Sequence, residues 1–166
     1  MITQAAITQL QSLQNILLQI NDTDYSLPIP TLKGASIGKH TRHIVEFYQC
    51  LLFNVTDNTV NYDKRNRNLL LEENVKYTLD YITEIIDNIE RIDTNKRLLL
   101  ASIFDDKEYV METSLYREIN YNVEHTVHHL AIIGIAIPLH FSYINTSANF
   151  GYAQSTIDYI KTQQAS

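Results

Sequence analysis

The longest helical pattern of the chain, from residue 114 to residue 138, reads SLYREINYNVEHTVHHLAIIGIAIP. Ser114 is suited to cap the start of a helix, because its hydroxyl can accept a hydrogen bond from a backbone N–H of the first turn. Pro138 marks the expected end, since proline lacks the N–H that a helix interior needs. This stretch therefore predicts one long helix from about Ser114 to Ile137.

Three other stretches repeat apolar residues every three or four positions, as one face of a helix does. They cover residues 2–20, 37–53 and 71–89. A short helix is expected to open at Ser155, and the two prolines near residue 30 predict a loop over residues 22–30. Because strand signals are weak, we expect an all-α fold, a four-helix bundle with a possible small hairpin within residues 97–113.

Composition limits the classes of function. The chain has 166 residues, 45% of them hydrophobic, and a net charge of −6, which suits one globular domain over residues 1–166 and disfavours nucleic-acid binding. A single cysteine, Cys50, excludes an internal disulfide and a thiolate zinc finger. The apolar stretch 130–139 is about half of what spans a bilayer. We expect a cytoplasmic protein without nucleic-acid or membrane partners.

Histidines carry the strongest chemical signal. His125 and His129 lie one turn apart on the long helix, at the edge of its apolar stripe. His43 borders the apolar face of the helix over residues 37–53. Two histidines from one helix and one from a neighbour could hold a divalent ion and leave positions open for water or substrate, which is the catalytic pattern. Histidines at this spacing also occur by chance, and a histidine in a helical bundle is often a hydrogen-bonded packing residue.

Two further histidines lie close to these in sequence. His128 points about 100° away from His129 around the helix, which makes it a poor third ligand. His40 lies one turn before His43 and is either a residue that orients a ligand or an ordinary, partly buried polar residue.

Charged residues near the histidine segments have two interpretations each. Glu118 lies two turns before His125 and could orient a ligand or simply pair with a cation. Asp63 and Arg65 fall in the polar connection over residues 54–68. Their side chains could reach the mouth of the site, or form a local ion pair on a solvated loop.

Five short motifs resemble one family in order and position. They are SIGKHTRHI at residues 36–44, YDKRNR at 62–67, TSLYRE at 113–118, EHTVHH at 124–129 and GYAQSTI at 151–157. Together they resemble the DinB/YfiT-like family of metal-dependent enzymes. One departure is Gln154, where related chains often have proline.

The resemblance implies a fold and a metal site. The implied fold is an up-down-down-up four-helix bundle, commonly a homodimer, with residues 54–68 as the crossover between the second and third helices. By position, the implied ligands are His43, His125 and His129, holding a divalent metal that is often nickel or zinc.

The implied function is a metal-dependent enzyme acting on a small molecule. Some relatives implied by the resemblance are S-transferases that use low-molecular-weight thiols, and others resemble amide hydrolases. The sequence offers no obvious carboxylate base beside the ligands, so both reactions stay open. The alternatives are a non-catalytic dimeric helical bundle that binds a metal or small ligand, and an interaction bundle with core histidines.

Overall fold

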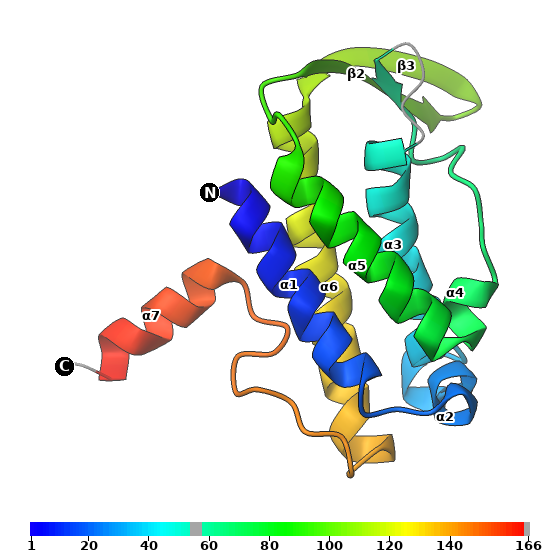
Figure 1. Ribbon diagram of the computed structural model, residues 1–166, viewed down its shortest axis with the longest axis vertical. Helices are drawn as coiled ribbons and strands as arrows, with labels where there is room; N and C mark the ends of the chain where they lie inside the picture. Colours follow the sequence, from blue (N-terminus) through cyan, green and yellow to red (C-terminus); the bar gives the residue numbers. More distant parts are fainter. Residues whose placement is uncertain (54–57, 165–166) are drawn as a thin grey trace.

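A computed structural model describes residues 1–53 and 58–164 of the chain. Four long helices, α1, α3, α5 and α6, lie side by side, and a small sheet crosses one end of them (Figure 1). The elements are α1 (Ile2–Leu17), α2 (Asp22–Ser26), a 3₁₀ helix (Pro30–Leu32), α3 (Ile37–Phe53), β1 (Thr59–Val60), α4 (Leu70–Glu73), α5 (Val75–Arg91), β2 (Arg97–Phe104), β3 (Lys107–Ser114), α6 (Leu115–His140) and α7 (Gln154–Gln164).

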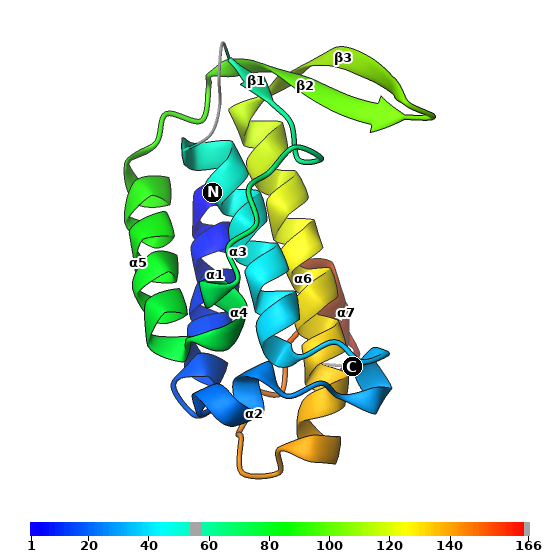
Figure 2. The same cartoon turned by 90° about the vertical axis from the view of Figure 1, so that its right-hand side faces the viewer.

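The expected all-α class is wrong, because three strands form a mixed sheet in the order β1-β2-β3. The fold is therefore a mixed helix-and-sheet fold and not a pure four-helix bundle. β1 runs parallel to β2, and β3 pairs antiparallel with β2. The β2–β3 hairpin extends beyond the helix ends (Figure 2). Asp105 and Asp106 form the two-residue turn with φ of 49° and 60°, as a type I′ hairpin requires.

The physical reason for the error lies in the burial of the strands. The sequence predicts the hairpin only as a possibility, because three consecutive leucines in β2 hide the alternation of apolar and polar residues that is typical of a strand. Leu98 and Leu100 are buried whereas Leu99 is 38% exposed. Every residue of β3 is exposed or partly buried, so no apolar face identifies it, and β1 has only two residues.

Helix boundaries follow local capping. The hydroxyl of Ser36 accepts from the Lys39 amide at 2.9 Å and that of Ser114 accepts from the Arg117 amide at 3.2 Å, which fixes the starts of α3 and α6. α6 continues past the expected end at Ile137 to His140, since Pro138 lies in its last turn and removes only one helical hydrogen bond.

The loop expected over residues 22–30 is partly wrong. Residues 22–26 form the short helix α2, whose first turn is capped by Asn21 accepting from the Asp24 amide at 2.9 Å. The two prolines lie after this helix and do not prevent it. α7 begins one residue earlier than expected, at Gln154.

The core lies between the long helices, with α6 in contact with both α1 and α3. Leu10, Ile44, Ile82 and Ile133 represent it and are at most 1% exposed. Gly38 allows α3 to approach α4 closely, because a Cβ at this position would collide with the backbone carbonyl of Glu72. This contact anchors the first turn of α3, the helix that presents His43 toward α6.

None of the helices in the described part of the chain combines the length and the apolar character that crossing a bilayer demands. The cytoplasmic location expected from the sequence stays a prediction.

Candidate metal centre

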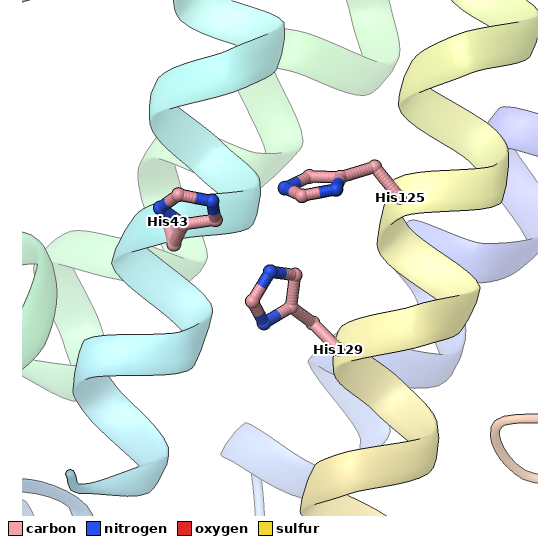
Figure 3. A group of neighbouring side chains, drawn as sticks. All are labelled: His43, His125 and His129. Atoms are coloured by element: carbon pink, nitrogen blue, oxygen red, sulfur yellow. The ribbon is translucent and has the colours of Figure 1, made fainter.

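Three histidines from two helices meet between α3 and α6. His43 comes from α3, and His125 and His129 come from α6. Their ring centroids are 4.9 Å apart for His43–His125, 4.7 Å for His43–His129 and 4.6 Å for His125–His129. One ring nitrogen of each points into the space between the rings (Figure 3), and the three ligand atoms lie within 4.8 Å of one another. The three histidines are close enough to hold a metal ion.

The hydrogen bonds of the rings identify the converging atoms as Nε2. His129 Nδ1 lies 2.9 Å from His40 Nδ1, and His43 Nδ1 lies 3.2 Å from Arg65 Nη2, so both Nδ1 atoms face away from the cluster. His125 Nε2 is buried without a hydrogen-bond partner among the described residues. A buried polar nitrogen without a partner is costly, and a metal ion would satisfy it.

His40 can set the tautomer of His129. A neutral imidazole carries one proton, so in the Nδ1–Nδ1 contact one ring donates and the other accepts. When His129 donates, its Nε2 keeps a lone pair directed at the other two histidines. An outer hydrogen bond of this kind orients metal-binding histidines in many sites. His40 therefore fits the role of a residue that orients a ligand.

Burial keeps the three histidines of the cluster and His40 neutral. It lowers the pKa of His43 to about 4, helped by the nearby Arg65 charge, and it lowers the pKa of His129 to about 3, helped by the surrounding imidazoles. Burial also lowers the pKa of His125 and of His40. The neutral ring is the form that binds a metal, so the electrostatic environment suits the cluster for that role.

Arg65 lies directly beside the cluster, which agrees with the interpretation that its side chain reaches the mouth of the site. It donates to the Tyr62 carbonyl at 2.8 Å and pairs with Glu46 at 3.5 Å, and its guanidinium lies 4.8 Å from the Phe47 ring centroid. Because Arg65 can only donate, His43 Nδ1 must accept, and a neutral His43 then carries its proton on Nε2. To bind a metal ion through Nε2, His43 would need the tautomer that carries the proton on Nδ1.

This geometry makes a testable prediction about Arg65. Arg65→Gln should tighten Zn²⁺ binding by about tenfold in a calorimetric titration, since the glutamine carbonyl can accept the Nδ1 proton of a coordinating His43. The matched control, Arg65→Lys, keeps the charge and the donor-only character and should show no tightening. Equal affinities in the two variants would contradict this interpretation of the contact.

His128 lies outside the cluster. It is exposed, its ring centroid is 5.3 Å from that of His129, and it does not belong to the group of possible ligands. The expectation that it is a poor ligand agrees with this geometry.

Among the residues that the structure describes, Glu118 and Asp63 form no hydrogen bond with the histidines. Glu118 is fully buried and accepts from the hydroxyls of Thr113 at 2.6 Å and Tyr62 at 3.0 Å, and from Arg117 at 2.8 Å. Asp63 accepts from the Ile103 amide at 2.9 Å, which attaches residues 58–68 to the hairpin.

Aromatic residues form a wall beside the histidines. Phe47 stacks on His125 at 4.4 Å and contacts His43 at 4.8 Å, and Tyr121 stacks on His125 at 5.8 Å. Phe47 lies four residues after His43 and Tyr121 four residues before His125. Positions four apart share a helix face, so this spacing was the signal that could have found them.

No family model and no solved structure matches the chain. The chain is 33% identical over 111 residues to FK506-binding protein 5 of Rhizopus delemar, an alignment that covers 63% of this chain and 28% of that protein. The chain thus spans less than a third of this relative. Membership of the DinB/YfiT-like family stays a prediction.

Proposed function

We propose that this protein is a divalent-metal-dependent enzyme acting on a small molecule, with His43, His125 and His129 as the ligands of a nickel or zinc ion. The observation that carries the proposal is the convergence of the three histidines from α3 and α6. Within residues 1–53 and 58–164, the group of possible ligands contains these three residues and no fourth. Three protein ligands leave coordination positions for water or substrate, as in catalytic zinc sites.

His40, Phe47 and Tyr121 suit this role, whereas the contact of Arg65 with His43 opposes it. A bound ion would supply Lewis acidity, for ionising water or lowering the pKa of a thiol. His40 would orient His129 through the Nδ1 contact. Phe47 and Tyr121 would keep bulk water from one side of the cluster, which strengthens electrostatic interactions there.

Two reactions fit the proposal, hydrolysis and transfer of a low-molecular-weight thiol to an electrophile. In the described part of the chain, no carboxylate belongs to the cluster, and Glu118 is engaged with three donors elsewhere. A proton taken from the nucleophile would therefore go to solvent or to an imidazole that is not a ligand. The lack of a carboxylate in the described cluster also favours the second candidate function, a non-catalytic module that binds a metal or ligand.

Elemental analysis of untagged protein tests the metal site. We expect about one nickel or zinc ion per chain, given three ligands in one cluster. A polyhistidine tag would bring its own metal and must be absent. Protein that stays free of metal after incubation with Zn²⁺ or Ni²⁺ would refute the proposal.

Activity of the loaded protein separates the candidates. Two probes are p-nitrophenyl acetate for hydrolysis, and N-acetylcysteine with 1-chloro-2,4-dinitrobenzene for S-transfer, in which the sulfur replaces chloride on the ring. We expect one of the two rates to exceed those of chelator-treated protein and of the free ion. Metal binding without either rate would favour the non-catalytic module.

A further inference from the structure

A cavity of about 260 Å³ lies between the helices and the hairpin. One side consists of Phe47, Tyr62 and Tyr121, and the other consists of residues of β2, including Leu100, Ser102 and Phe104. These three β2 residues alternate along the strand and so share one face of the sheet. The cavity thus has aromatic rings on the helix side and a further aromatic ring at its outer edge.

The cavity adjoins the histidine cluster through shared walls. Phe47 and Tyr121 line the cavity, and both rings also contact His125, with centroid distances of 4.4 Å and 5.8 Å. Tyr62 extends the wall, since it stacks on Phe47 at 4.8 Å with an angle of 10° between the rings. A molecule in the cavity is therefore separated from His125 by the thickness of one side chain.

The charged residues of the lining have partners within the protein. Arg117 donates to buried Glu118 at 2.8 Å, and its guanidinium lies 5.2 Å from the Tyr121 ring centroid. Asp63 accepts from the Ile103 amide at 2.9 Å. Because one positive and one negative residue line the cavity and both are engaged, the lining favours no net charge on a guest.

We propose that this cavity binds a flat, uncharged aromatic part of the substrate. Planar rings pack well on aromatic faces, and a volume of 260 Å³ suits one or two fused rings rather than a larger ligand. The inference rests on the proposed function, since the cavity shares Phe47 and Tyr121 with the surroundings of His125, and the group that reacts would have to extend past these side chains to the histidine cluster.

Binding of 2-naphthol tests the cavity without any reaction. A ligand-observed NMR titration of the full chain should detect binding, and the saturated analogue decahydro-2-naphthol, which is not planar, should bind at least about fivefold more weakly. Equal binding of the two compounds would overturn the preference for a flat ring.

Variants of the hairpin locate the binding. Ser102→Trp would fill the cavity and should weaken 2-naphthol binding by at least about tenfold. Val110→Trp is the matched control, because it puts the same side chain on the same hairpin at a 58% exposed position outside the lining. Phe104→Ala, at a 63% exposed position, removes one wall with little risk to folding and should weaken binding a few-fold. Unchanged binding in both lining variants would overturn the proposal.

A Zn²⁺ titration of the same variants separates this inference from the proposed function. Ser102→Trp should leave Zn²⁺ affinity unchanged, because Ser102 contributes no ligand atom. If Zn²⁺ binds and 2-naphthol does not, the cavity inference fails and the metal site stands. If 2-naphthol binds as expected and Zn²⁺ does not, the proposed function fails and the aromatic site stands.

Discussion

Replacing His129 by alanine should lower the affinity for Zn²⁺ by at least about 100-fold, because loss of even an outer hydrogen-bond partner of a ligand commonly costs 10–100-fold. The substitution removes one of the three converging nitrogens and leaves His43 and His125 as a two-ligand site. It also removes the partner of His40. Calorimetric titration of untagged protein measures the affinity, and circular dichroism verifies that the variant is folded.

His128→Ala is the matched control for this prediction. It makes the same change at the neighbouring position of α6, on an exposed ring that does not belong to the cluster. Its Zn²⁺ affinity should stay within about twofold of the wild type, since it removes no ligand. Equal losses in the two variants, or no loss in His129→Ala, would show that the ligands are assigned wrongly.

Replacing Glu118 by leucine should lower the free energy of unfolding by about 3 kcal/mol, because buried donors that lose their acceptor each cost about 1–3 kcal/mol. The carboxylate is fully buried and accepts from Thr113, Tyr62 and Arg117. Arg117 has a side chain that is 55% exposed and can turn to water, so its pair adds little to this figure. Urea denaturation followed by circular dichroism measures the loss.

Glu118→Gln separates the hydrogen bonds from the shape of the side chain. Glutamine keeps the size and one acceptor oxygen but places an amide NH₂ against one of the donors, so an intermediate loss of about 1–2 kcal/mol is expected. A leucine variant as stable as the wild type would contradict the inference that the hydrogen bonds of Glu118 stabilise the fold. The bond to Tyr62 also fixes one wall of the aromatic cavity, so both variants should weaken 2-naphthol binding.

The helices and the histidine positions could be predicted because their signals are local. Ser36 and Ser114 are caps that act within one turn, and the spacing of His125 and His129 puts them on one face of α6 whatever surrounds it. The position of His43 against this pair could be predicted only from the family resemblance and from its place at the edge of an apolar face.

The sheet and the surroundings of the site depend on contacts between distant residues, which single-sequence patterns do not encode. Strand β3 has no buried face to produce an alternation, and Arg65 reaches His43 only because residues 58–68 fold back along α3. Asp63 and Glu118 each had a functional and a structural interpretation. In the structure, Asp63 accepts a hydrogen bond from Ile103 of the hairpin, and Glu118 belongs to a hydrogen-bond network with Tyr62.

The spacing of the three histidines along the chain also links the cluster to folding. His125 and His129 are neighbours as soon as α6 forms, whereas His43 lies about eighty positions earlier and joins them only when α3 docks on α6. An ion held by all three would act as a cross-link between the first and second halves of the chain. Because the unfolded chain keeps at most the local pair, metal concentration would control thermal stability through mass action, and unfolding would release the ion.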